Sequence, residues 1–579
     1  MTPLAEPSSL EQTPALARES LLRRIAPHRE ERLFLVLSIF IGIISGLLVV
    51  LFRMAIEWIS ILTLGSAPHP GQPRLLIIPA VAGLMVAALV RWIFPHARGS
   101  GINQTKAALY IYDGYISLKT TTGKFLTSAI AIGAGHSLGP EDPSLQIGAG
   151  VASFVSRHLK LSRQRLRLFA PIGAAAGLAA AFNAPISAIL FVIEEVIGRW
   201  SAGVLGSIVL SAISSVVVAR WFWGSEPMFR IPQVNLRDPR ELIAYAVLGA
   251  VGGVASLVFS KALGYLRPLL RRQPRWTEFL QPAVAGLLVG LIGYLGFPQV
   301  MGPGYGAIDQ AMHGQFAWKV LLALGALKIL ATTVSFSSGT PGGMFAPTLF
   351  VGAMLGGAVG SFEKVLFPHF TGAVGSYALV GMGVLFAGFM RAPITSVFMV
   401  LEVSGNYSII LPVILANAIA YLISRILQPV PVFELFTHQD GLDLPSMEVQ
   451  REESSLHVED ALRPVDVPIL SGSATLATGL STIEEAGAAF LLISTIGQQW
   501  HVLSAAGLRD LSANRGAEAT LDQTIGPERT PTLFPDMALD TVIPHLAHWP
   551  LLPVMNRARR GSLEGVITLD DVLRRYQSE

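Results

Sequence analysis

Residues 135–148 read GHSLGPEDPSLQIG, and residues 339–352 read GTPGGMFAPTLFVG. Both stretches hold glycine, proline and leucine in one register, and each matched residue of the second lies 204 positions after its partner (339 − 135). So many matches at a single offset indicate two halves of the chain built on one plan. The pairs are Lys124/Lys328, Gly135/Gly339, Gly139/Gly343, Pro143/Pro347, Leu145/Leu349 and Gly148/Gly352.

The composition indicates that lipid surrounds most of the chain. Of the 579 residues, 51% are hydrophobic and 14% are charged, and apolar stretches recur from Leu33 to about Leu427. Some are long enough to span a bilayer, for example 33–52, 75–94 and 168–196. Others, such as 125–135 and 344–357, are shorter and broken by glycine and proline, as expected of half-helices that end inside a membrane. Sparse charge argues against the alternative, the buried helices of a large soluble protein.

Several classes of protein are disfavoured. A net charge of +3 is too small to indicate nucleic-acid binding. The chain has no cysteine, which excludes disulfides, thiolate metal sites and a cysteine nucleophile. It has no His-Glu-x-x-His, no Gly-x-Ser-x-Gly and no membrane aspartate pair, so an intramembrane enzyme is not expected. We predict no metal site and no catalytic residue.

The chain divides into four segments. Residues 1–31 are polar, and the arginines near the first span predict a cytoplasmic N-terminus. Residues 32–428 form the membrane domain, with repeats at about 75–222 and 278–427, and residues 429–447 form a linker. Residues 448–579 have the charge density of a soluble domain. The arginines are Arg18, Arg23, Arg24, Arg29 and Arg32.

The last segment contains one strand–strand–helix pattern twice. This alternation predicts a small α/β domain with two-fold internal symmetry, cytoplasmic like the N-terminus. The first copy is 490–494, 500–504 and a helix around Leu508, and the second is 551–555, 565–568 and 570–576.

Three glycine-rich turns are candidates for anion binding. Residues 99–103 read GSGIN, where exposed amides and the Ser100 hydroxyl can bind an anion, although a serine beside glycine is also an ordinary helix cap. Residues 139–143 and 343–347 occupy equivalent places in the two halves, and each predicts a helix with proline in its first turn. If the two helix N-termini meet inside the membrane, their amides attract an anion without any full positive charge.

Three carboxylates stand out beside these turns. Glu141 could occupy an anion site in place of the ion and leave it on protonation; the alternative is that it only favours a helix N-terminus, as Asp142 does. Glu194 and Glu195 end an apolar stretch. Glu194 has a repeat partner, Glu402, and is the better structural candidate, whereas Glu195 has Val403 opposite and is the better functional one.

These residues together resemble the CLC family of chloride channels and chloride/proton exchangers, over about residues 32–579. The turn at 99–102 is similar to the family's GSGIP segment, 139–143 to GREGP, 343–347 to GxFxP, and 173–195 to bacterial exchangers. The resemblance implies an all-α polytopic membrane fold with two inverted repeats and broken helices. It further implies a homodimer with one pathway in each subunit, and tandem CBS domains at the C-terminus.

The resemblance implies chloride/proton antiport, with a passive chloride channel as the alternative; Ser100 and the turn at 343–347 disfavour fluoride export. Chloride, protons, membrane lipid and a second copy of the chain are the expected partners, in the cell membrane. The implied roles are a central anion site at Ser100, Gly343 and the amides of Met344 and Phe345; an outer site at Gly139, Pro140 and Glu141; a gating carboxylate, Glu141; an internal proton relay, Glu195; and an inner gate, Phe433.

The chain departs from the family pattern at four positions. Pro140 and Asp142 replace the arginine and glycine beside the gating glutamate, which we expect to weaken anion attraction at the outer site. Asn103 replaces the proline of GSGIP, and Phe433 replaces a tyrosine and lacks its hydroxyl.

In the C-terminal segment, Thr568 and Asp571 fit the Thr-x-x-Asp pattern that holds a ribose, whereas Ser504 is followed by Gly507 where an acid is expected. At most one adenine-nucleotide site is expected, and a purely structural or dimer-packing role stays open. No other cofactor is expected.

Overall fold

The structure, a computed structural model, describes residues 13–66, 68–158, 163–198, 202–229, 238–367, 372–442, 444–447, 456–495, 499–524, 530–557 and 562–577. For residues 13–33, 163–165, 202–203, 499 and 577 only the backbone is described, so the side chains of the N-terminal arginines lie outside it. The chain forms two compact units, Met1–Met447 and Glu448–Glu579.

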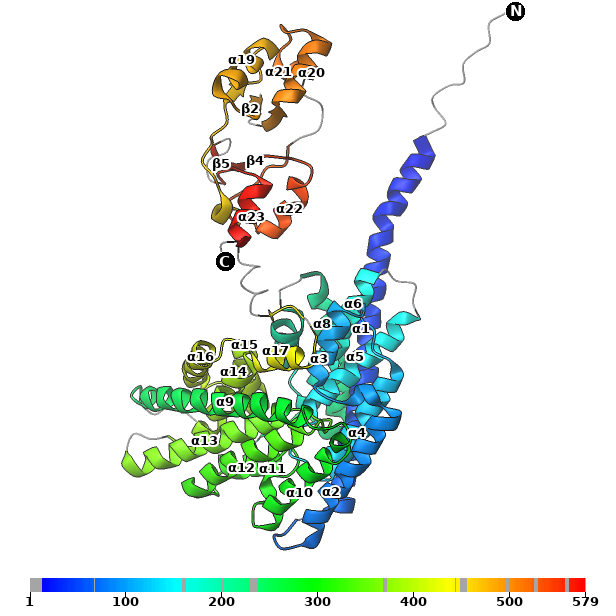
Figure 1. The fold of residues 1–579 in the computed structure, drawn as a ribbon, viewed down its shortest axis with the longest axis vertical. Helices are drawn as coiled ribbons and strands as arrows, with labels where there is room; N and C mark the ends of the chain where they lie inside the picture. The colour runs from blue at the N-terminus through cyan, green and yellow to red at the C-terminus, as the bar shows by residue number, and fades with distance from the viewer. Residues whose placement is uncertain are drawn as a thin grey trace, which may run out of the picture. The chain divides into compact units, whose positions relative to one another are not determined.

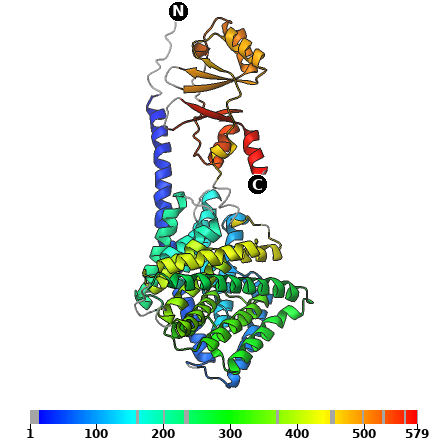
Figure 2. The same cartoon turned by 90° about the vertical axis from the view of Figure 1, so that its left-hand side faces the viewer.

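The first unit is a bundle of helices throughout its described part (Figures 1 and 2). Within the described residues, eight helices are long and apolar enough to cross a membrane. The helices are α1 (Thr13–Thr63), α2 (Pro73–Ala88), α3 (Gly101–Tyr110), α4 (Leu118–Gly133), α5 (Glu141–Arg157), α6 (Arg163–Phe182), α7 (Pro185–Phe191), α8 (Ala202–Trp223), α9 (Glu241–Arg271), α10 (Gln281–Tyr294), α11 (Tyr305–Met312), α12 (Trp318–Ser337), α13 (Phe345–Leu366), α14 (Val374–Met390), α15 (Pro393–Ser404), α16 (Ile410–Leu427) and α17 (Val432–Gln439).

The predicted continuous span at 168–196 is wrong, because the chain breaks between α6 and α7. Asn183 adopts a left-handed backbone with φ of 56°, and Pro185 disfavours a helical conformation at Ala184. After α7 the chain continues as a π-helical turn, Val192–Ile197, which carries Glu194 and Glu195. The hydrophobicity pattern did not predict this break.

The predicted half-helix at 344–357 is also wrong, because α13 continues to Leu366. Its glycines do not interrupt it; they let it pack tightly against α14. A β-carbon on Gly352 would stand 2.3 Å from the carbonyl oxygen of Gly381, and one on Gly356 would stand 1.9 Å from that of Tyr377. Glycine therefore sets the distance between two helices here and does not end a helix.

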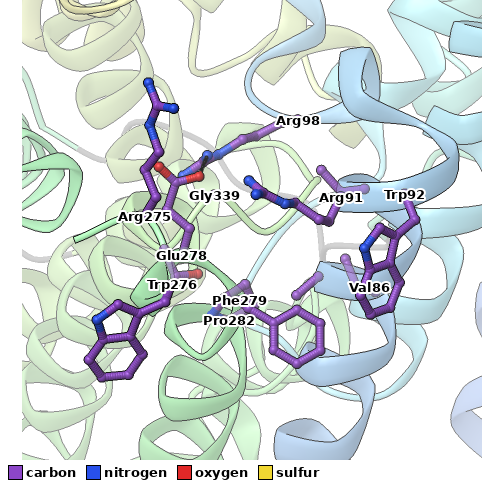
Figure 3. A pocket seen from close by; sticks show the side chains of 13 residues that line it. Val86, Arg91, Trp92, Arg98, Arg275, Trp276, Glu278, Phe279, Pro282 and Gly339 are labelled. Atoms are coloured by element: carbon purple, nitrogen blue, oxygen red, sulfur yellow. Dashed lines mark hydrogen bonds and ion pairs between the residues drawn. The ribbon is translucent and has the colours of Figure 1, made fainter. Parts of the chain in front are cut away.

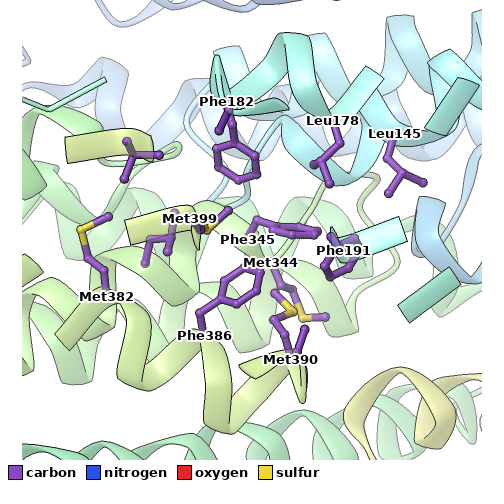
Figure 4. Packing of buried hydrophobic residues seen from close by; sticks show 14 of the residues in the cluster. Leu145, Leu178, Phe182, Phe191, Met344, Phe345, Met382, Phe386, Met390 and Met399 are labelled. Carbon is purple, nitrogen blue, oxygen red and sulfur yellow. The ribbon is translucent and has the colours of Figure 1, made fainter. Parts of the chain in front are cut away.

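An aromatic cluster joins the two halves of the first unit. The ring of Phe345, the first residue of α13, lies 5.8 Å from Phe182, 4.8 Å from Phe191 and 5.4 Å from Phe386, measured between centroids. Figure 4 shows these side chains packed together with methionines of α14 and α15. The N-terminus of α13 is thereby anchored in the core between the halves.

The second unit contains two small sheets. In the first sheet, β1 (Ile469–Ser471) pairs parallel with β2 (Phe490–Thr495), which pairs antiparallel with β3 (Gln499–Ser504). In the second, β4 (Leu552–Met555) and β5 (Leu563–Ile567) pair antiparallel. The helices are α19 (Leu476–Ala486), α20 (Ala505–Arg515), α21 (Leu521–Thr524), α22 (Leu539–Leu546) and α23 (Leu569–Gln577). Each predicted strand–strand–helix copy is present.

Candidate ion pathway

Two backbone hydrogen bonds join the repeats at their centre. Gly139 and Gly343 each donate an N–H to the other's carbonyl oxygen, both at 2.8 Å. This bridge brings together the N-termini of α5, which begins at Glu141, and α13, which begins at Phe345. The first amides of a helix have no partner within it and carry positive potential, so the bridge concentrates anion-attracting groups inside the protein.

Glu141 lies at this junction with its side chain fully buried. Tyr305, the first residue of α11, donates its hydroxyl to Glu141 Oε1. Glu141 Oε2 and the amide nitrogen of Ala346 lie 2.3 Å and 3.1 Å from the position that a β-carbon on Gly139 would take. Gly139 must therefore be glycine for the carboxylate to lie beside the first turn of α13.

Tyr305 was missed by the sequence interpretation, although the repeat points to it. The offset of 204 places it opposite Gly101, the residue that begins α3 (305 − 101). Pro140, which was predicted to line the outer site, precedes α5, and its carbonyl accepts from the Ser144 amide at 2.9 Å. Because proline has no N–H, this position offers an anion no backbone donor.

Asp142 points to the other short helix. Ser100, which caps the N-terminus of α3, donates its hydroxyl to Asp142 Oδ2 at 3.0 Å, and the amide of Ile102 donates to Oδ1 at 3.0 Å. The Asp142 carboxylate is thus bonded at the start of α3, whereas its expected effect on anion attraction at the outer site stays a prediction. The two residues are neighbours in the first turn of α5, and adjacent helical side chains diverge.

Two buried lysines hold the loops that lead into these short helices. Lys124 Nζ donates to the carbonyl oxygens of Ala97 and Gly99 at 3.1 and 2.5 Å, just before α3. Lys328, its repeat partner, donates to those of Val300 and Gly302 at 2.9 and 2.6 Å, just before α11.

Two cavities with no lining residue in common are lined by residues that contact the neighbours of the junction: Ser100, which bonds to Asp142, and Phe182, which packs on Phe345. One, of about 800 Å³, is lined by Ser100, Asn103 and Gln146 among others. The other, of about 590 Å³, is lined by Arg53 and Asn183 among others.

Arg53 supplies a cation to the second cavity. Its guanidinium stacks on Trp223 at 4.3 Å and lies within electrostatic range of Glu141. It offers Glu141 a positive charge that Pro140, beside that glutamate, does not supply. The sequence interpretation missed it because α1 is remote from the motifs along the chain.

A third cavity, of about 370 Å³, is lined by none of the predicted site residues. Figure 3 shows Arg91 and Arg98 on one wall, with Trp276 and Glu278 on the other. Arg98 and Glu278 form an ion pair at 3.0 Å. This pair joins the loop before α3 to the segment before α10.

Glu194 and Glu195 have different partners despite being adjacent. Glu195 forms a buried ion pair with Lys106 of α3. Glu194 accepts from the amide of Thr395 at 2.8 Å at the start of α15, and its counterpart Glu402 accepts from the amide of Ser187 at 2.7 Å at the start of α7. This reciprocal capping agrees with the structural role expected for Glu194.

Phe433 and Met344, the remaining predicted site residues of the C-terminal half of the membrane unit, are both buried. The carbonyl oxygen of Phe433, in α17, accepts from Asn103 Nδ2 at 3.0 Å, so the departure at position 103 ties α3 to α17. Met344 is fully buried and immediately precedes α13.

In the second unit, Thr568 and Asp571 bond to each other around the start of α23. The Thr568 amide donates to Asp571 Oδ2 at 2.9 Å, its hydroxyl donates to the same oxygen at 2.6 Å, and the Asp571 amide donates to Thr568 Oγ1 at 3.3 Å. This arrangement is a capping box.

The fold and the bridged helix N-termini define a polytopic membrane protein with an anion-attracting centre. Residues 82–425 match the family model described as "Voltage gated chloride channel". The chain is 32% identical over 435 residues to the H(+)/Cl(-) exchange transporter ClcA of Salmonella arizonae, spanning 73% of this chain and 92% of that protein. The chain therefore belongs to the voltage-gated chloride channel family, the CLC proteins.

Solved structures share the fold. A slow cyanobacterial Cl-/H+ antiporter superposes with a TM-score of 0.64 at 24% identity, over 70% of this chain and 97% of that one. A eukaryotic CLC transporter superposes with a TM-score of 0.61 at 19% identity, over 93% of this chain and 97% of that one. The second match extends into the C-terminal unit.

Proposed function

We propose that this protein exchanges chloride for protons across a membrane. The observation that carries the proposal is the buried carboxylate of Glu141, placed where the N-termini of α5 and α13 are bridged. The relative at 32% identity is named an H(+)/Cl(-) exchange transporter.

The proposed cycle needs two carboxylates with different tasks. Ionised Glu141 occupies the anion-attracting junction, and protonation weakens its hold there, so that a chloride ion replaces it. Glu195, held by Lys106, passes the proton between Glu141 and the side of the membrane away from Arg53. Chloride interacts with Ser100 and with the amides of Met344 and Phe345.

A passive chloride channel is the second candidate, and Phe433 favours it. Its ring offers no hydroxyl to an anion at the inner gate, so an anion could pass without waiting for the proton step.

Purified protein in liposomes separates the two. Under the exchange proposal, an imposed chloride gradient drives protons uphill. Chloride movement with no change in internal pH would establish the channel instead. Glu141→Gln should abolish proton movement, and a variant that keeps the wild-type proton flux would remove Glu141 from the mechanism.

The proposal extends to the oligomeric state of the protein and to its orientation in the membrane. We propose a homodimer whose N-terminus and C-terminal unit are cytoplasmic. Ile186 and Ile394, equivalent in the two repeats, are exposed to 45% and 47%, which suits contact with lipid or a second copy. Single-molecule photobleaching in liposomes should show two steps, and proteolysis of right-side-out vesicles should spare residues 456–577.

For the C-terminal unit, we propose that Thr568 and Asp571 act as a helix cap. An adenine nucleotide that used Asp571 for its ribose would have to displace this cap. Calorimetry of the full chain with ATP, ADP and AMP tests the nucleotide alternative, and heat of binding that Asp571→Asn removes would establish it.

A further inference from the structure

We infer that Asp142 is a second tethered carboxylate in the pathway: it occupies the anion position at Ser100, and chloride binds there only when it moves away. The inference rests on the proposed function, because it takes Ser100 as part of the chloride site. It goes beyond that proposal by assigning a competing ligand to the site.

The contacts of Asp142 are those that an anion at this position would make. Its two carboxylate oxygens accept from the Ser100 hydroxyl and the Ile102 amide, each at 3.0 Å. Asp142 is fully buried, and Ser100 is 4% exposed. A β-carbon on Gly101 would stand 2.6 Å from Asp142 Oδ1, so the glycine of this turn leaves the space that the carboxylate fills.

Among the residues that the structure describes, none forms a direct ion pair with Asp142, and the surrounding charge holds its carboxylate. The N-terminus of α3 carries positive potential, and Lys124, buried among the carbonyls before α3, lies within electrostatic range of Asp142. Glu141, the other acidic group in this turn, faces Tyr305 instead. The positive potential of α3 and Lys124 therefore compensates one negative charge at Ser100. A chloride ion that arrived beside the Asp142 carboxylate would be repelled.

Asp142 also stands at an entrance. Ser100 lines the cavity of about 800 Å³, so an ion in this cavity can reach the Ser100 position. Asp142 thus lies at the start of α3, whereas Glu141 lies beside the first turn of α13 and accepts from the Tyr305 hydroxyl of α11. Two tethered carboxylates, one on each side of the bridge, replace the single one expected from the sequence.

The test is the chloride affinity of the full-length protein with Asp142→Asn, which keeps the shape and removes the charge. We expect chloride binding, measured by calorimetry in detergent, to tighten at least tenfold, and the chloride concentration for half-maximal flux in liposomes to fall accordingly. Asp113→Asn, whose aspartate pairs with Arg167 at the surface, is the matched control and should change neither value. If Asp142→Asn is not monodisperse, Asp142→Ser takes its place.

A second measurement locates the ion. Crystals soaked in bromide should show anomalous density beside Ser100 Oγ in Asp142→Asn and not in the wild-type protein. Wild-type transport with unchanged chloride affinity in Asp142→Asn, or bromide at Ser100 beside an unmoved Asp142, overturns the inference and leaves the exchange proposal standing. Absence of chloride flux from both the wild type and the variant overturns the exchange proposal as well.

Discussion

The two repeats of the membrane unit differ in an instructive way. Where they agree, the matched residues hold the scaffold: Lys124 and Lys328 each bind a pair of loop carbonyls, and Glu194 and Glu402 each cap a helix of the other half. Gly139 and Gly343 bond to each other.

Where the repeats disagree, the residues face the proposed pathway. Glu141 and Asp142 correspond to Phe345 and Ala346 at the offset of 204 (345 − 141), and Glu195 corresponds to Val403 at the later offset of 208 (403 − 195). A transporter that moves two different ions needs groups that the two-fold plan does not duplicate. Residues that are the same in both repeats therefore hold the scaffold, and residues that differ between the repeats are the candidates for ion transport.

The largest effect is expected from the lysines. Lys124→Met and Lys328→Met each leave two buried carbonyl groups without their donor, and each such group costs about 1–3 kcal/mol. Both variants should unfold at markedly lower temperature in detergent, and by similar amounts. Lys119→Met, on the surface of α4, is the control. A drop in unfolding temperature for only one of the two lysine variants would contradict the equivalence of the two repeats.

The proton relay should show the strongest functional asymmetry. Glu195→Gln removes the titrating carboxyl, so proton flux in liposomes should fall at least tenfold while chloride flux persists. Glu194→Gln should keep the coupling between the two ions. Equal loss of coupling in both variants would mean that Glu194 is not purely structural and that the proton relay is not confined to Glu195.

The reciprocal caps should have smaller and equal effects. Glu194→Gln and Glu402→Gln weaken charge-assisted bonds to the first amides of α15 and α7, which we expect to cost about 1–2 kcal/mol each. Thermal unfolding of the two variants and of the double variant measures this. Unequal shifts in unfolding temperature would show that the two caps do not stabilise the protein equally, so that one half depends more on its cap from the other half.

The smallest effect is expected in the C-terminal unit, where the two strand–strand–helix copies have different helix caps. Ser504 accepts a single amide bond, from Gly507 at 3.1 Å, whereas Thr568 and Asp571 bond to each other reciprocally. Thr568→Ala should cost about 1 kcal/mol, and Ser504→Ala less. Denaturant unfolding followed on Trp549 for the second copy and on Trp500 for the first would rank them, and a larger cost at Ser504 would contradict the ranking.

Much of the membrane fold could be predicted from the sequence, because a repeat at a constant offset fixes which segments are equivalent. The break at Asn183 was missed because the apolar runs on either side of it were interpreted as one span, although Pro185 two residues later is a signal for a helix boundary. The extension of α13 was missed because glycine was interpreted as a helix breaker, whereas the facing backbone of α14 decides its role.

The candidate site was predicted less completely. Glu141, Ser100 and Glu195 lie in short motifs, and the repeat offset could have pointed to Tyr305 through its equivalence to Gly101, but Arg53 reaches the site only through the tertiary fold. The direction of Asp142 depends on which face of α5 meets α3, and no pattern within five residues encodes that.

The reciprocal caps also bear on how the protein is made. The first-turn amides of α7 are completed by Glu402, which lies 216 positions after Ile186 in the chain. At a synthesis rate of 5–20 residues per second, the first half waits roughly 10–40 s for that carboxylate. During this interval a newly inserted half has exposed amides inside the membrane, so the second half completes the folding of the first.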